Sequence, residues 1–189
     1  MKRLAIVMLS LFLLSGFALA QKVGSAAPDF TLVNDAGETI GPGDFLGTPY
    51  VLNAWATWCV PCVEELPFFQ RIHDEVNADS KEPVLNFFLI NNNEAATKAL
   101  PFLRDELEIS LPTGVEATKA QINAFKEQDI AIDKTLDVIK QYRIRGMPTT
   151  FFIDAEGIIQ AIKVGFLTPG ETTGLLATIG IDWTFDISN

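Results

Sequence analysis

Both cysteines of the 189-residue chain lie in one segment, Asn53-Ala54-Trp55-Ala56-Thr57-Trp58-Cys59-Val60-Pro61-Cys62. The run Tyr50 to Trp55 is apolar and rich in β-formers, which predicts a buried strand at about 49–56. Beyond the cysteines, apolar residues recur at helical spacing and predict a helix at about 60–78: Leu66, Phe69, Ile72 and Val76. The two cysteines therefore stand where a strand turns into a helix.

This placement has chemical consequences for the two thiols. Unpaired N–H groups and the helix dipole at a helix N-terminus stabilise a negative charge, so we expect the pKa of Cys59 to fall below that of a free cysteine. Cys62 lies one turn further on and should keep a higher pKa. Pro61 suits a first helical turn, where its missing N–H would have had no partner. We expect a dithiol that attacks a partner's disulfide through Cys59 and resolves the mixed disulfide through Cys62.

Other uses of a Cys-x-x-Cys pair are less consistent with this sequence. A zinc site needs about four ligands, and the chain has two cysteines and one histidine, so a carboxylate would have to complete the site. Covalent haem attachment needs histidine directly after the second cysteine, where Val63 stands. A purely structural disulfide would close too short a loop to stabilise much. We expect neither a metal nor a cofactor.

The N-terminus predicts export. Lys2 and Arg3 precede a nearly unbroken apolar run from Leu4 to Leu14, and Ala18-Leu19-Ala20 forms a small-x-small cleavage site. Residues 1–20 therefore read as a secretory signal peptide cleaved after Ala20, with an uncleaved signal anchor as the alternative. We expect the remaining residues, 21–189, to form one domain in the periplasm or on the outer face of the cytoplasmic membrane.

The charge balance limits the possible partners. The chain has a formal net charge of −10, which becomes −12 once Lys2 and Arg3 are removed, because residues 1–20 contain no acidic residue. An acidic surface argues against nucleic acid and anionic membranes as partners. It is compatible with protein partners, and we expect a monomer.

The rest of the chain alternates strands and helices, which predicts an α/β domain with a mixed sheet. The predicted strands are an N-terminal hairpin at 27–40, Val84 to Ile90, Ile130 to Ile132, Thr149 to Asp154 and Ile158 to Val164. The predicted helices are Ala95 to Leu107, Val115 to Gln128, 134–142 and Gly170 to Ile179. A break is predicted at 111–114, and Asn91-Asn92-Asn93 is interpreted as a polar cap before a helix.

Several motifs together resemble the thioredoxin superfamily, and more narrowly the exported TlpA/ResA-like thiol–disulfide oxidoreductases with an AhpC/TSA-Redoxin-like domain. These are the opening Ala27-Pro28-Asp29-Phe30-Thr31-Leu32, the cysteine segment itself, Cys62-x-x-Glu65-x-Pro67 and Gly146-Met147-Pro148-Thr149-Thr150-Phe151. The resemblance implies a thioredoxin fold: a central mixed sheet flanked by helices, with an N-terminal β-hairpin. The chain departs from the family between Ile90 and Asp129, where we expect an extra helical insertion at about 98–128.

The resemblance also implies which residues form the site. Cys59 is the expected nucleophile, Cys62 the resolving cysteine, and Met147-Pro148 a cis peptide bond. The expected substrate groove contains Trp58, Pro61, Met147, Pro148, Thr149 and Gly165, with Trp58 on its exposed rim and Trp55 in the core.

Glu65 is the third expected catalytic residue. It matches a glutamate that the family carries three residues after the second cysteine, and a partly buried carboxylate there could accept the Cys62 proton. The alternative is that Glu64 and Glu65 simply favour the first turns of a helix. Asn53 stands where cytoplasmic thioredoxins carry a buried aspartate, and asparagine cannot titrate.

The implied function is reduction of disulfides in client proteins, such as apocytochromes c or copper-site proteins of oxidase assembly. Electrons would come from a thiol carrier in the membrane. A disulfide-donating oxidase and a non-catalytic redox-gated chaperone or metal carrier are the alternatives. A peroxidase is disfavoured, because the Thr-x-x-Cys pattern of peroxiredoxins is broken by Ala56.

Overall fold

The computed structural model describes residues 22–184. The predicted signal peptide, residues 1–20, lies outside this part of the chain. Between residues 22 and 184, no helix combines the length and apolar character that crossing a membrane requires.

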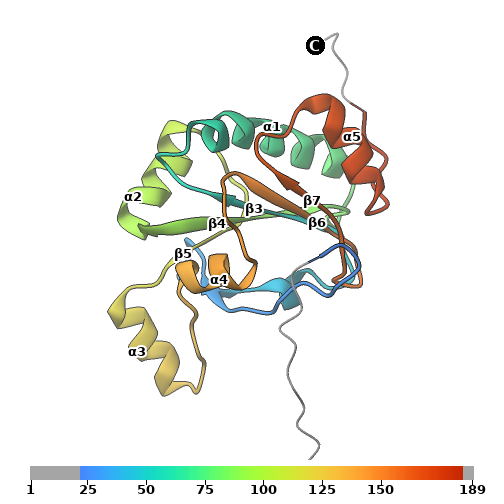
Figure 1. Ribbon diagram of the computed structural model, residues 1–189. Coiled ribbons are helices and arrows are strands. Elements are labelled where there is room, and N and C mark those ends of the chain that lie inside the picture. Colours follow the sequence, from blue (N-terminus) through green and yellow to red (C-terminus); the bar gives the residue numbers. More distant parts are fainter. Residues whose placement is uncertain (1–21, 185–189) are drawn as a thin grey trace, which may run out of the picture.

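The described residues build a mixed seven-stranded sheet in the order β2-β1-β5-β4-β3-β6-β7 (Figure 1). The strands are β1 (Leu32–Val33), β2 (Thr39–Ile40), β3 (Tyr50–Trp55), β4 (Asn86–Ala95), β5 (Thr113–Glu116), β6 (Thr149–Ile153) and β7 (Ile159–Val164). The helices are α1 (Val60–Asn77), α2 (Ala96–Pro101), α3 (Lys119–Glu127), α4 (Thr135–Gln141) and α5 (Pro169–Ala177). Strand β3 pairs in parallel with β4 and antiparallel with β6, so the strand that leads into the cysteines is central.

Strand β3 is buried on both faces, which explains its nearly continuous apolar sequence. Val51 and Trp55 belong to the core beneath α1, α2 and α5. Leu52 and Ala54 belong to the opposite core, which includes α4 and the N-terminal segment. Figure 1 shows this layering, with α1 and α5 on one face of the sheet and α4 on the other. Because side chains alternate along a strand, Asn53 faces the same side as Val51 and Trp55, towards α1.

The register of β3 and β6 fixes where Pro148 lies. Ala54 pairs with Thr149, so the start of β6 lies beside the end of β3. The peptide bond Met147-Pro148 directly precedes β6 and is cis, as the resemblance implied. The proline is thereby brought next to the loop that leads to Cys59.

Most predicted elements are confirmed within a few residues. The N-terminal hairpin, the strand before the cysteines, the helix after them and the final β6–β7 hairpin are all present. The predicted helix at 134–142 corresponds to α4, and the predicted helix from Gly170 corresponds to α5.

The region 108–132 contains the main errors. The predicted break at 111–114 leads into strand β5, which pairs with β4 on one side and β1 on the other. The insertion around 98–128 is therefore only partly helical. The predicted strand Ile130 to Ile132 is wrong, because these residues form no strand and Ile130 and Ala131 are exposed. The expected extra helix does exist as α3, which extends away from the sheet and contains no buried residue (Figure 1).

The polar run Asn91-Asn92-Asn93 is also corrected. These residues continue strand β4, and Asn91 pairs with Trp55 of β3. The helix they were expected to cap begins only at Ala96. Asn91 can stay in a buried strand because its side chain has a local partner, Glu94. Asn91 Nδ2 donates a hydrogen bond to the Glu94 carboxylate at 3.0 Å, and the Glu94 backbone N–H donates one to Asn91 Oδ1 at 3.0 Å.

Gly114 gives a stability test of the unexpected strand β5. A Cβ at this position would lie 2.6 Å from Leu32 Cδ1 and 3.1 Å from Phe88 Cζ. We predict that Gly114→Val destabilises the protein by about 1–3 kcal/mol through overpacking. Urea unfolding followed by circular dichroism measures this.

Gly174 in α5 is the matched control, because a Cβ there would meet no heavy atom within 4 Å. Gly174→Ala should stabilise the protein by about 0.5–1 kcal/mol, since alanine loses less entropy in a helix. Equal effects of the two substitutions would contradict the position of β5 between β1 and β4.

Candidate active site

The two cysteines form a disulfide at the beginning of α1. Cys59 is the residue before the first helical turn, and its carbonyl accepts the first helical hydrogen bond from the Val63 N–H at 3.0 Å. Cys59 retains 5% exposure, whereas Cys62 is fully buried. Cys62 Sγ lies 4.0 Å from the Ala54 carbonyl oxygen. Only Cys59 is therefore open to an incoming sulfur atom.

Large apolar side chains lie exposed around this disulfide. Trp58 is 62% exposed and Val60 is also exposed, while Trp55 is fully buried, as predicted for both tryptophans. On the loop after β7, Phe166 is exposed as well. Exposed apolar residues that gather at one place are typical of a surface that contacts another protein.

The cis peptide bond and the loop after β7 meet beside the cysteines. The Gly165 N–H donates a hydrogen bond to the Pro148 carbonyl oxygen at 2.8 Å. Gly165 has a φ of 86°, a left-handed conformation that glycine adopts without strain. Met147 is half-buried and Pro148 buried. The loop after β7 is therefore joined to the cis bond, and the assignment of these residues to a substrate groove stays a prediction.

The remaining expected groove residues differ in what they can present. Pro61 is half-buried in the first turn of α1. Thr149 is buried, and its Oγ1 donates a hydrogen bond to the Gly146 carbonyl oxygen at 2.7 Å. The Thr149 side chain thus holds the turn before the cis bond.

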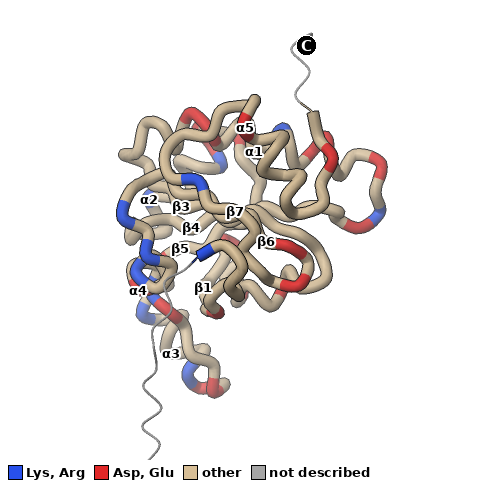
Figure 2. Tube along the Cα trace, turned by 45° about the vertical axis from the view of Figure 1, so that its right-hand side comes forward, with Lys and Arg blue, Asp and Glu red and all other residues tan. Residues whose placement is uncertain are grey.

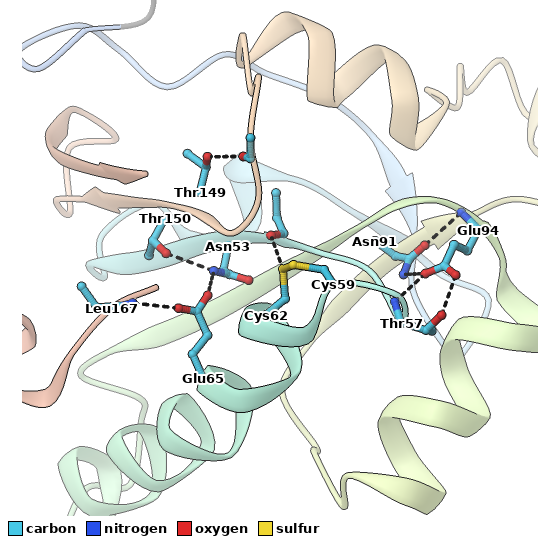
Figure 3. Close-up of a disulfide and its surroundings, with 12 residues drawn as sticks. Asn53, Thr57, Cys59, Cys62, Glu65, Asn91, Glu94, Thr149, Thr150 and Leu167 are labelled. Carbon is cyan, nitrogen blue, oxygen red and sulfur yellow. Dashed lines mark hydrogen bonds between the residues drawn. A yellow bond between two sulfur atoms is a disulfide. The ribbon is translucent and has the colours of Figure 1, made fainter. Parts of the chain in front are cut away.

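Glu65 is fully buried on the face of α1 that meets the sheet (Figure 3). Its carboxylate accepts hydrogen bonds from Asn53 Nδ2 at 2.8 Å and from the Leu167 N–H at 3.1 Å. Burial raises the pKa of Glu65 to about 7, although these two donors and the charge of Lys163 act to lower it. A carboxyl group that changes protonation state near neutral pH therefore lies one helical turn from Cys62.

Asn53 has a role that its sequence position alone did not reveal. Its Nδ2 also donates to Thr150 Oγ1 at 3.0 Å, so the amide joins β6 to α1 through β3. Its Oδ1 is buried and has no hydrogen-bond partner among residues 22–184. Sequence reasoning established only that asparagine cannot titrate. The alternation of side chains along β3 could have indicated that Asn53 faces the helix that carries Glu65.

Glu94 is a second residue that sequence reasoning missed. Its carboxylate accepts hydrogen bonds from both the Thr57 N–H at 2.8 Å and Thr57 Oγ1 at 2.7 Å (Figure 3). It also forms an ion pair with Lys98. Thr57 lies two residues before Cys59, so Glu94 holds the loop that presents the disulfide. The polar run after an apolar strand was the available signal, but it was interpreted as a helix cap.

The chemistry of the site resides in the sulfurs and the neighbouring carboxyl group. Between residues 22 and 184, no group of three His, Cys, Asp or Glu side chains is placed to hold a metal ion. The arrangement is a disulfide with one accessible and one buried sulfur, beside a buried carboxyl group that can take up or release a proton near pH 7.

Comparison with known proteins agrees with this geometry. The family model AhpC/TSA family matches residues 23–162. The thiol-disulfide oxidoreductase ResA of Oceanobacillus iheyensis is 32% identical over 162 residues, which cover 84% of this chain and 73% of that protein.

Two solved structures share the fold. A thiol:disulfide interchange protein of the thioredoxin family from Chlorobium tepidum superimposes with a TM-score of 0.59 at 26% identity, covering 85% of this chain and 99% of the other. A secreted thiol-disulfide isomerase from Corynebacterium glutamicum superimposes with a TM-score of 0.62 at 22% identity, covering 82% of this chain and 86% of the other. With its Cys59–Cys62 pair, this thioredoxin-like chain belongs to the AhpC/TSA family and is a thiol–disulfide oxidoreductase.

Proposed function

We propose that the protein reduces disulfides of client proteins outside the cytoplasm, with Cys59 as nucleophile and Cys62 as resolving cysteine. The observation that carries this proposal is the unequal exposure of the pair. Cys59 is partly accessible just before α1, while Cys62, within the first turn of α1, is fully buried. A partner's sulfur can reach only Cys59.

The reaction proceeds in two exchanges. The Cys59 thiolate attacks one sulfur of the client disulfide, an S–S bond forms between them, and the other client sulfur leaves as a thiolate. Cys62 then loses its proton and attacks Cys59 Sγ, which releases the second client thiolate and forms the Cys59–Cys62 disulfide. Two electrons pass to the client. Glu65 accepts the Cys62 proton, because its raised pKa keeps it basic near pH 7 and it lies one turn away.

The N-terminal sequence and the redox state of the pair support a location outside the cytoplasm and a separate electron donor. Residues 1–20 have the sequence of a signal peptide, and the Corynebacterium glutamicum structure is that of a secreted protein. In an oxidising compartment the pair rests as a disulfide unless a donor reduces it, so a thiol carrier in the membrane supplies the electrons. Clients of the apocytochrome c or copper-oxidase assembly type fit a reductant of this kind.

Trapping of the mixed disulfide tests the roles of the cysteines. We predict that reduced Cys62→Ser accumulates a covalent adduct with a peptide that contains an oxidised Cys-x-x-Cys-His motif, because the second exchange cannot occur. Mass spectrometry under non-reducing conditions measures the adduct. Cys59→Ser is the control and should give none, and a Cys62→Ser variant without adduct would favour a non-catalytic binding module.

The direction of electron flow is tested by the reduction potential of the pair. Equilibration of the wild-type protein with defined thiol buffers should give a value near or below about −230 mV, towards the reducing end of the thioredoxin-like range. A value near about −120 mV would identify an oxidase that donates disulfides and would replace the reductase proposal.

The ionisation of Glu65 makes a pH-dependent prediction. The pKa of Glu65 is raised from 4.5 to about 7 on folding, so the folded state holds this proton more tightly than the unfolded state. The contribution of Glu65 to the free energy of unfolding of the oxidised protein should therefore be full below pH 4.5 and be lost as the pH rises through 7, by about 3 kcal/mol. Urea titrations across this pH range measure it.

Glu65→Gln should flatten this pH dependence, and Glu64→Gln, which removes the same charge from an exposed neighbour, should preserve it. The rate of the second exchange should also lose its inflection near pH 7 in Glu65→Gln alone. An unchanged pH profile of that rate would exclude Glu65 as the proton acceptor.

A further inference from the structure

The loop between α4 and β6 lines two pockets, one of which includes Trp58, the residue before Cys59. It consists of Arg143-Ile144-Arg145-Gly146 and leads directly into the cis bond. One pocket, of about 330 Å³, is lined by Trp58, Asn92, Ile139, Ile144, Arg145, Gly146 and Met147. The other, of about 210 Å³, is lined by Tyr142, Arg143, Ile144, Arg145, Gly146, Thr149, Phe151, Ile162 and Val164. We call these two pockets and the loop between them the Arg145 face.

The Arg145 face has a charge opposite to that of the chain as a whole. Its charged lining residues are Arg143 and Arg145, and no aspartate or glutamate lines either pocket. The complete chain has a formal net charge of −10. In Figure 2, basic residues gather on the side of the molecule where α2 and α4 lie. A local basic site on an acidic protein selects an acidic partner through charge complementarity.

Arg145 is the residue most open to such a partner. It is exposed, and between residues 22 and 184 its side chain forms no ion pair and no side-chain hydrogen bond. Three lysines on neighbouring elements are paired instead, since ion pairs join Lys98 to Glu94, Lys140 to Asp137 and Lys163 to Glu171. Arg145 lines both pockets, and its guanidinium group can donate two parallel hydrogen bonds to a carboxylate.

The face lies where residues next to a client's cysteine would rest. Trp58 precedes Cys59, and Met147 precedes Pro148, so the larger pocket opens between the two parts of the site. A client sulfur at Cys59 therefore places its neighbouring residues over this pocket. The pocket offers apolar surface from Trp58, Ile144 and Met147, and one cationic group at its edge.

We propose that the Arg145 face binds a client segment in which an apolar or aromatic residue and an acidic residue stand next to the reacting cysteine. The apolar side chain enters the pocket at Trp58 and Met147, and the carboxylate pairs with Arg145. This inference rests on the proposed function, because it specifies which clients the Cys59–Cys62 pair selects.

The first exchange can be measured alone with the reduced Cys62→Ser variant. The probes are three capped peptides, Gly-Phe-Asp-Cys-Ala-Gly and its versions with Asn or Lys in place of Asp, each joined through cysteine to an uncharged 2-thiopyridyl group. Attack by Cys59 on the peptide sulfur forms the mixed disulfide and releases pyridine-2-thione, whose absorbance gives the rate. The uncharged 2-hydroxyethyl 2-pyridyl disulfide reports the intrinsic reactivity of Cys59, and each peptide rate is divided by it.

We expect the Asp peptide to react about tenfold faster than the Lys peptide, with the Asn peptide between them. Adding Arg145→Glu should reverse this order. Adding Lys81→Glu is the matched control, because it changes the charge equally and lies beyond the far end of α1, about 27 Å along the helix from the disulfide. The control should leave the order unchanged.

The possible outcomes distinguish a failure of the proposed client selection from a failure of the proposed disulfide exchange. Equal normalised rates for the three peptides, or the same reversal in Lys81→Glu, would overturn the inference while Cys59 still exchanges disulfides. No adduct with any peptide or with the small reagent would overturn the proposed function itself. Retention of the wild-type protein, but not of Arg145→Glu, by vesicles of anionic phospholipid would assign the face to a lipid surface and overturn the client proposal.

Discussion

The pairing of β3 with β6 is the constraint on which the site depends. With Ala54 opposite Thr149, the end of β3 lies beside the beginning of β6. The disulfide follows β3 in the chain and the cis proline directly precedes β6, so both are brought to this place. A slip of one residue would turn Asn53 away from α1 and turn Ala54, which packs in the opposite core, towards α1 in its place. The register is well specified, because β3 is buried on both faces and each face needs its own set of apolar side chains.

Much of this fold could be predicted from the sequence because its central strands and α1 carry strong local patterns. The apolar run before the cysteines and the helical spacing after them indicate β3 and α1 directly. Strand β5 could not be predicted in this way. It has four residues, includes Gly114 and follows a proline, so locally it resembles a turn. It is a strand because β4 and β1 supply hydrogen-bonding partners on either side, and glycine lets it approach Leu32 and Phe88. Ile130 to Ile132 show the converse, since β-forming residues without a neighbouring strand form none.

The site residues also differ in whether they could be predicted from residues nearby in the sequence. Cys59, Cys62 and Glu65 lie within seven residues, and their spacing on one helix could be read from the sequence. The partners of Glu65 could not, because Asn53 comes from β3 and Leu167 from the loop after β7. Glu94 is 37 residues from Thr57, and only the parallel pairing of β3 with β4 brings them together.

Glu65 and Glu94 show how the fold gives one residue type two opposite properties beside one disulfide. Burial raises the pKa of Glu65 to about 7, and its two donors do not offset the loss of water. Burial would also raise the pKa of Glu94, but hydrogen bonds from Lys98, Thr57 and Asn91 outweigh it and lower that pKa to about 2. Glu94 therefore stays ionised at any physiological pH and can hold the loop at Thr57 without change during exchange. Glu65 can gain or lose a proton over the same range, so the carboxyl group on the helix of the buried sulfur is the one suited to follow the redox state of the pair.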